Sequence, residues 1–237
     1  MSLSMDRRKW MKKCSAWLAS TGLLAGSSVS CKGTENGSSA GSSGPGYNAY
    51  FGDIHNHNSL GYAKGSLERS FDIAASHLDF FSMTPHSHWH DMPVMEKNKH
   101  MIWVNGFKKT REGWPKARKL TESYYKPGRF VTFHGYEWHS SRYGDFCMIF
   151  PGNDAPMTAF DSPEQLQEFA FGKGALLIPH HPAYLQGRRG ANPSVWDPRV
   201  TGLLEIFSEH GNAEIDRGPC DYIRHSMGGR STPNTLQ

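Results

Sequence analysis

From Tyr47 onward the chain alternates short apolar runs with longer stretches that are compatible with helices. The apolar runs predict strands at Tyr50–His55, Asp79–Thr84, Phe130–Tyr136, Phe146–Phe150, Ala175–Pro179 and Leu203–Phe207. Helices are expected between them, at Ser66–Ser76, within Phe107–Tyr125 and at Ser162–Phe171. Such an alternation predicts an α/β fold with a parallel sheet, either open or closed into a barrel.

Two of these helices begin at capping residues. Ser66 is an N-cap residue, although Arg69 rather than a glutamate stands at the third helical position. The start at Ser162 is stronger, because it places Pro163 at the first helical position with Glu164 beside it. The sequence therefore predicts helices that begin directly after Ser66 and Ser162.

Histidine and acidic side chains gather at the ends of the predicted strands. They are His55 and His57, then His86, His88 and His90, then Glu137 and His139, then Asp145 at the start of its run, then His180 and His181, and last Glu205 and His210. Residues two apart on a strand point to the same side, so His55 and His57 can offer two nitrogen ligands to one metal. Because such groups are costly to bury unless they are paired or bound to metal, the pattern predicts a metal site at the carboxyl edge of the sheet.

Several of these segments resemble, in order, the motifs of the PHP superfamily, named for polymerase-associated and histidinol phosphatase domains. They are His55-x-His57, Leu78 to His86, Gly135-Tyr136-Glu137 and Ile178-Pro179-His180. A further segment, Gly202 to Gly211, is similar to one in an exported branch of unassigned function. The resemblance covers residues 50–237 and implies a distorted (β/α)7-type barrel with two or three divalent metals at its C-terminal face.

The resemblance also implies roles for individual residues. His55 and His57 would hold the first metal. Glu137 would bridge two metals, because a carboxylate has two oxygens to share. His86 and His180 would bind the second metal or the third.

Other candidates follow from the same comparison. Asp145 stands where many members carry a histidine, and it can still bind a hard or borderline cation. His181 competes with His180 for one role, and His88 and His210 form a second tier of candidates. Nitrogen and carboxylate ligands together suit Zn, Mn or Fe.

Besides Asp145, the chain departs from the family pattern at three places. Pro85 replaces the aspartate that usually precedes the histidine of the second motif, and Tyr62 and Ala63 lie where an aspartate often follows the first. The late Asp-x-His pair of the family is missing before Gln237, and the last residues read like the opening of a helix at Thr232. We therefore expect a barrel truncated in its C-terminal part.

The first 46 residues have the composition of an export signal followed by a flexible linker. A cationic segment precedes a short apolar run and small residues up to Cys31, which predicts an export signal over 1–31, and 32–46 is a Gly/Ser-rich spacer before the domain at 47–237. Asp6 to Lys12 resembles a twin-arginine signal, and Ser28 to Cys31 resembles a lipoprotein box. Acylation of Cys31, cleavage without a lipid, and a retained membrane anchor all stay open. The expected location is periplasmic or membrane-tethered in a bacterium.

The charge and the cysteines narrow the partners further. Residues 1–46 hold six cations against two anions, which accounts for the whole formal charge of +4, so the folded part lacks the net basic charge of a nucleic-acid-binding domain. Outside the signal only Cys147 and Cys220 remain. They could pair in an oxidising compartment, but the apolar run around Cys147 favours a buried small hydrophobe.

The predicted chemistry is metal-assisted hydrolysis of a phosphate ester by an activated water, on a small-molecule or glycan-linked substrate. Arg188, with Arg189 beside it, could contact the phosphate, although a solvated loop pair is the alternative. The second hypothesis is a degenerate module at the cell surface that binds a metal or ligand without catalysis. Pro85 and the missing late motif favour that second hypothesis.

Overall fold

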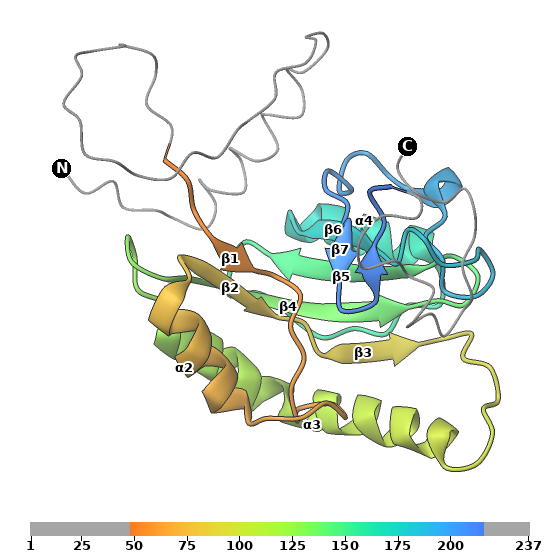
Figure 1. Ribbon diagram of the computed structural model, residues 1–237, viewed down its shortest axis with the longest axis horizontal. Helices are drawn as coiled ribbons and strands as arrows, with labels where there is room; N and C mark the ends of the chain where they lie inside the picture. The colour runs from red at the N-terminus through yellow and green to blue at the C-terminus, as the bar shows by residue number, and fades with distance from the viewer. Residues whose placement is uncertain (1–47, 216–237) are drawn as a thin grey trace, which may run out of the picture.

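The computed structural model describes residues 48–215, which form a mixed α/β domain (Figure 1). Its helices and strands are β1 (Gly52–Asp53), α2 (Leu67–His77), β2 (Phe80–Met83), β3 (His86–Trp89), α3 (Lys99–Tyr124), β4 (Val131–His139), β5 (Asp145–Phe150), α4 (Pro163–Lys173), β6 (Leu176–His180), the short 3-10 helix η1 (Pro193–Val195), β7 (Phe207–Ser208) and β8 (Gly211–Asn212). The predicted export signal (1–31), the spacer (32–46), Cys31, Cys220 and the helix start at Thr232 lie outside the described residues. No helix within residues 48–215 is both long and apolar enough to cross a membrane.

The main sheet has the strand order β1-β2-β4-β5-β6, and β3 also pairs with β4. Strands β2 and β3 follow one another along the same side of β4, with Met83 opposite His134 and His86 opposite Glu137. Pro85 separates them, because it has no N–H to donate to a ladder, but its carbonyl accepts a hydrogen bond from the Glu137 N–H at 3.0 Å. Strands β2 and β3 therefore act as one interrupted strand beside β4, and this places His86 next to Glu137.

The prediction of a parallel sheet is correct only for part of it. Strands β1, β2 and β4 run parallel, and so do β3 and β4, but β5 runs antiparallel to both β4 and β6. Residues 140–144 connect β4 to β5, which is too short a link for a helical crossover, so the chain turns back on itself. This reversal places Asp145, at the start of β5, at the same edge as the ends of β4 and β6.

The last predicted strand, Leu203–Phe207, is also largely wrong. Only Phe207–Ser208 is a strand, and it pairs with Gly211–Asn212 in a separate two-stranded sheet. The Glu205 N–H donates to the Pro179 carbonyl at 3.2 Å, so this irregular segment still runs beside β6.

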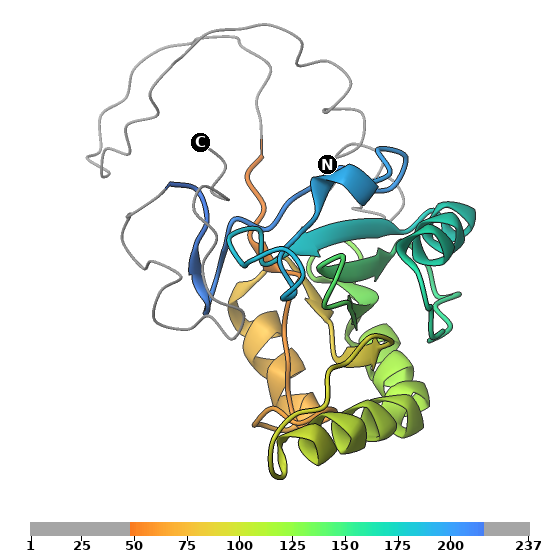
Figure 2. The same ribbon diagram turned by 90° about the vertical axis from the view of Figure 1, so that its right-hand side faces the viewer.

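The strands curl into half of a barrel (Figure 2), an arrangement consistent with an incomplete barrel. Helices α2 and α3 cover β2, β3 and β4 on one side of the sheet, and α4 packs beside β6 (Figure 1). The main core lies between the helices and the sheet and includes Phe71 of α2, Trp114 of α3 and Leu166 of α4.

The two faces of β4, β5 and β6 have different chemistry because side chains alternate along a strand. Tyr136, Trp138, Phe146, Met148 and Leu177 point toward the helices and join the main core. The other face begins with an apolar cluster of Val131, Phe133, Cys147, Ile149 and Ile178. Further along the same strands, that inner face carries Glu137 and His139, Asp145, and His180. Cys147 is 1% exposed, as predicted for a small buried hydrophobe.

The predicted helix starts are confirmed. The hydroxyl oxygens of Ser66 and Ser162 accept hydrogen bonds from the backbone N–H groups of Arg69 and Gln165. Helix α4 ends at Gly174, whose φ of 61° suits a residue without a side chain. Helix α3 is longer than predicted and contains Pro115.

Candidate metal centre

The carboxylate of Glu137 lies among four imidazole rings. Its Oε2 is 3.0 Å from His86 Nδ1, 3.3 Å from His57 Nε2 and 3.5 Å from His55 Nε2, and its Oε1 is 3.5 Å from His139 Nδ1. The side chain of Glu137 is 1% exposed, and within residues 48–215 neither oxygen has a hydrogen-bond partner of good geometry. The oxygens of this buried carboxylate and the nitrogen atoms around it together form a suitable set of ligands for a cation.

His55 and His57 converge as predicted, although they lie beyond β1 rather than on it. Their Nε2 atoms are 3.0 Å apart. The loop that carries them is fixed by Asp53, whose Oδ1 accepts from the His55 N–H at 2.9 Å. It is also joined to the end of β2, because Asn56 and Thr84 exchange hydrogen bonds of 3.1 and 2.9 Å.

Glu205 supplies a second carboxylate to the site. Its Oε1 is 2.7 Å from His180 Nδ1, and its Oε2 contacts His55 Nδ1. His180 is the last residue of β6, which explains how the neighbouring irregular segment brings Glu205 to it. Two histidines thus share one carboxylate from a distant part of the chain.

His86 connects Glu137 to two further rings. Its Nδ1 is 2.7 Å from His139 Nε2, and its Nε2 is 2.7 Å from the Tyr62 hydroxyl. His86 is on β3 and His139 ends β4, so the pairing of these strands brings the two rings together.

Asp145 is fully buried and pairs with an arginine. Its Oδ2 accepts from Arg189 Nε at 2.8 Å and also from Arg189 Nη2. The same oxygen is 3.2 Å from His139 Nδ1 and 3.7 Å from His181 Nε2. Asp145 therefore connects the histidine cluster to a buried guanidinium.

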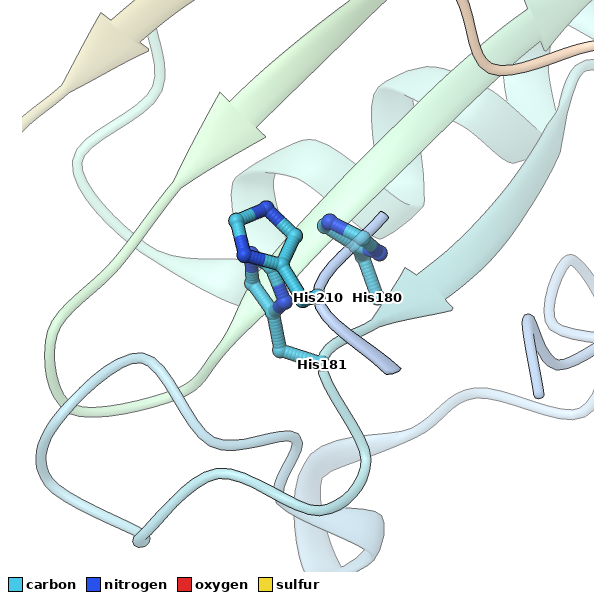
Figure 3. Close-up of side chains that lie close together, drawn as sticks. All are labelled: His180, His181 and His210. Atoms are coloured by element: carbon cyan, nitrogen blue, oxygen red, sulfur yellow. The ribbon is translucent and has the colours of Figure 1, made fainter. Parts of the chain in front are cut away.

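The rings of three further histidines, His180, His181 and His210, lie close together (Figure 3). The ring centroids of His181 and His210 are 4.5 Å apart, and those of His180 and His210 are 5.8 Å apart. His180 and His181 come from the end of β6, whereas His210 lies in the turn between β7 and β8. The Tyr184 hydroxyl lies 2.9 Å from His210 Nδ1.

Five groups of three residues within 48–215 bring ligand atoms within 4.8 Å of one another. They are His55, His57 and Glu137; His55, His180 and Glu205; His86, Glu137 and His139; Glu137, Asp145 and His181; and His180, His181 and His210. Because Glu137, His55 and His180 each belong to more than one group, the groups form one continuous array that could hold metal ions. Most of its members line a single cleft of about 870 Å³.

The protonation states suit metal binding. Burial lowers the pKa values of His57, His86, His180 and His181, which favours neutral imidazoles, the form that binds metals. Burial alone would raise the pKa of Glu137, but its histidine neighbours, led by His139 and His86, outweigh burial and hold that pKa well below its usual range.

His55 behaves differently. Burial lowers its pKa, but contacts with Cys147, Glu137 and Glu205 outweigh burial and raise the pKa well above its usual value. The same contacts act on Glu205, where hydrogen bonds with His180 and His55 overcome burial and lower the pKa to about 2. These directions favour a protonated His55 beside an ionised Glu205.

The structure gathers most of the residues singled out in the sequence. The residues His55, His57, His86, Glu137, Asp145 and His180 all belong to the array, and so do His181 and His210. His88 does not, because the pairing of β3 with β4 shifts register between His86 and His88, and its Nε2 faces Asp161 Oδ1 at 3.7 Å. Arg188 lines a neighbouring pocket, whereas Arg189 lines both that pocket and the cleft.

Three members of the site were given no ligand role from the sequence, although His139 and Glu205 were among the residues noted at the strand ends. Glu205 belongs to a segment with a recognisable pattern, but its partners are far away along the chain. His139 follows Glu137 by two residues on one strand, and that spacing was a usable signal that they share a face. Tyr62 had no such signal, because its contact with His86 depends on how the loop before α2 folds.

Comparison with known proteins adds one partial match. A family model described as a protein of unknown function (DUF3604) matches residues 73–158. The matched segment contains His86, Glu137, His139 and Asp145, but not His55, His57, His180 or Glu205. A comparison with curated proteins and one with solved structures each gave no match.

Proposed function

We propose that this chain is a metal-dependent hydrolase that cleaves phosphate esters on a PHP-type (β/α)7 barrel. The observation that carries the proposal is the environment of Glu137, a buried carboxylate with four imidazole nitrogens within 3.0 to 3.5 Å. No well-oriented hydrogen bond from the described part of the chain reaches its two oxygens. A protein has little reason to hold these groups together in its interior unless a cation joins them.

The residues present fit two or three divalent ions such as Zn, Mn or Fe. His55, His57 and Glu137 would hold one, with His180 and Glu205 on the other side of His55. When bound, such ions supply Lewis acidity and a water of lowered pKa. The chain supplies fixed ligands: Glu205 orients His55 and His180, and the Tyr62 hydroxyl and His139 restrain His86.

With metal ions bound to offset the carboxylates that line it (Asp53, Glu137, Glu205 and Glu209), the cleft suits an anionic substrate. Lys64, Lys99 and Arg189 line it together with the proposed metal ligands. Cations beside a cleft attract a phosphate group and stabilise the charge of its transition state. We infer a small-molecule or glycan-linked phosphoester, which an exported protein would meet outside the cytoplasm.

The test uses the full 237-residue chain. The protein is stripped with a chelator, reloaded with Zn, Mn or Fe(II), and assayed for bound metal and for turnover of a generic phosphodiester and phosphomonoester. Glu137→Gln keeps the shape but removes the charge, and we expect it to lose metal affinity and turnover by about 10–100-fold. Glu168→Gln, at a side chain that is 69% exposed on α4, is the matched control and should change neither.

The alternative, a metal- or ligand-binding module without catalysis, is favoured by Pro85, which cannot supply the carboxylate of the family motif. Metal bound at the site of Glu137, without turnover of any ester in the panel, would support the module and exclude the hydrolase. Absence of bound metal in the reloaded wild-type protein would contradict the hydrolase and the metal-binding form of the module.

A further inference from the structure

Arg189 is a buried cation that contacts the candidate metal ligands. Its Nε and Nη2 donate to Asp145 Oδ2. Its Nη2 is also 3.2 Å from His139 Nδ1 and 4.0 Å from Glu137 Oε1. The side chain is only 7% exposed, which is unusual for a charge unless it has a structural or chemical task.

These contacts are the ones that a metal ion would make. Asp145 and Glu137 belong to one of the groups with metal-binding spacing, and Glu137 and His139 belong to another. The guanidinium lies against all three side chains and neutralises the Asp145 carboxylate. A second full positive charge in the same place would be repelled by this cation.

The backbone holds Arg189 in this place. Its φ of 69° lies in the left-handed region, which is uncommon for a residue with a side chain. Its N–H donates to the Ser141 carbonyl at 2.9 Å, which joins its loop to the connection between β4 and β5. In that connection a Cβ on Gly144 would lie 2.7 Å from Ala191 Cα, so the two loops pack too closely for a side chain at Gly144.

Two aromatic rings surround the guanidinium on other sides. Its Cζ is 5.0 Å from the centre of the Trp89 ring and 5.3 Å from that of Trp103. Rings at this distance attract a cation and exclude water from it. One nitrogen with two N–H groups remains, because Nη1 is buried and has no hydrogen-bond partner within residues 48–215. Arg189 lines the cleft, so an anionic group bound there could accept from Nη1.

We propose that the Arg189 guanidinium takes the place of a third metal ion, so that the chain binds at most two, and that Nη1 binds an anionic oxygen of the ligand. This inference rests on the proposed metal site and makes it more specific. The third cation of the site is then covalently part of the chain and cannot be removed by a chelator. Its planar fork would also orient a tetrahedral anion such as phosphate.

Metal counting on the full chain tests the first part. After reloading with Zn or Mn, elemental analysis should find no more than two ions per wild-type chain. In Arg189→Met the charges of Asp145 and Glu137 lose their cation, and we expect one additional ion per chain. Arg188→Met, which removes the neighbouring charge outside the cleft, should keep the wild-type count.

Calorimetric titration with inorganic phosphate tests the second part. Arg189→Met should weaken phosphate binding to the metal-loaded protein by about tenfold or more, because a charged donor is lost, and Arg188→Met should not. Arg189→Lys, which keeps the charge without the fork, should keep two ions but bind phosphate less well than wild type.

The outcomes are distinct. Three ions per wild-type chain would overturn the inference while leaving the proposed hydrolase intact, and this measurement needs no variant to fold. An unchanged metal count and unchanged phosphate affinity in folded Arg189→Met would overturn it as well. A wild-type chain that binds no metal would instead remove the proposed function on which the inference depends.

Discussion

The carboxylate of Glu205 contacts the ring of His55, a residue 150 positions earlier in the chain. Its other oxygen is 2.7 Å from His180 Nδ1. One side chain therefore joins the loop after β1 to the end of β6, the two strands at opposite ends of the main sheet. Glu205 bridges the half-barrel across its open side and sets the orientation of two proposed metal ligands.

We expect Glu205→Gln to weaken metal binding by about 10–100-fold, because the amide cannot hold both histidines with a negative charge. Competition with a chromogenic chelator measures the affinity. Glu209→Gln is the matched control, since Glu209 lines the same cleft but belongs to none of the five ligand groups. Equal losses in the two variants would show that general charge in the cleft, and not the bridge, sets the affinity.

The metal-free protein should lose stability as the pH falls from about 7.5 to about 5.5. His57, His86, His180 and His181 have pKa values lowered by burial, so below their usual value of 6.5 the unfolded chain binds protons that the folded chain does not. The lowered pKa of each group therefore makes the folded state less stable below pH 6.5 than above it. His55 has a raised pKa and acts in the opposite direction, but it is one group against four.

Urea unfolding at a series of pH values measures this dependence. Glu205 extends the loss of stability to lower pH. Its pKa is lowered to about 2 in the folded chain, so its stabilising contribution disappears as the pH falls below its usual pKa of 4.5. Replacing His86 by Gln should flatten the dependence near neutral pH. A stability that rises on acidification to about pH 5.5 would show that His55 dominates.

The local features of this protein could be predicted from its sequence because they depend on near neighbours. Ser66 and Ser162 cap helices through bonds three residues away, and the Nε2 atoms of His55 and His57, two residues apart in the loop after β1, lie 3.0 Å from each other. Asp145 was assigned to the site, but the direction of β5 was not foreseen. A strand and its reverse have the same apolar pattern, and only the short connection at 140–144 distinguishes them.

The contacts that complete the site could not be predicted in this way. Glu205 meets His55 only because the sheet curls, and His88 leaves the cluster because of a register shift that leaves no mark in the sequence. Arg188 and Arg189 are adjacent and chemically identical, yet only Arg189 lines the cleft. Its left-handed backbone and the packing of its loop on Ser141 decide which of the two arginines turns inward.

Removing the metal should lower the melting temperature. A ligand that binds only the folded state, at about 100 times its dissociation constant, stabilises it by about 2.7 kcal/mol, or roughly 5–10 °C for a domain of this size. Thermal melts with and without a chelator measure the shift. In Glu137→Gln the shift should shrink, because the central carboxylate is neutral. Identical melting temperatures for wild type in both conditions would mean that no metal couples to folding.

Stability and metal binding should be separable at β6, whose side chains alternate between the two faces of the sheet. Leu177 is fully buried in the helix-facing core, whereas His180 lies on the inner face of the same strand. Leu177→Ala should cost about 2–5 kcal/mol of unfolding free energy through the lost contacts and the cavity left behind. Ile73→Ala on α2, where the side chain is 50% exposed, should change it by less than about 0.5 kcal/mol. Denaturant unfolding gives both values, and the number of bound ions should stay that of wild type in folded Leu177→Ala. A reduced metal count in folded Leu177→Ala would mean that the helix-facing core also positions His180. The ligands on the inner face of the sheet would then not be held independently of that core.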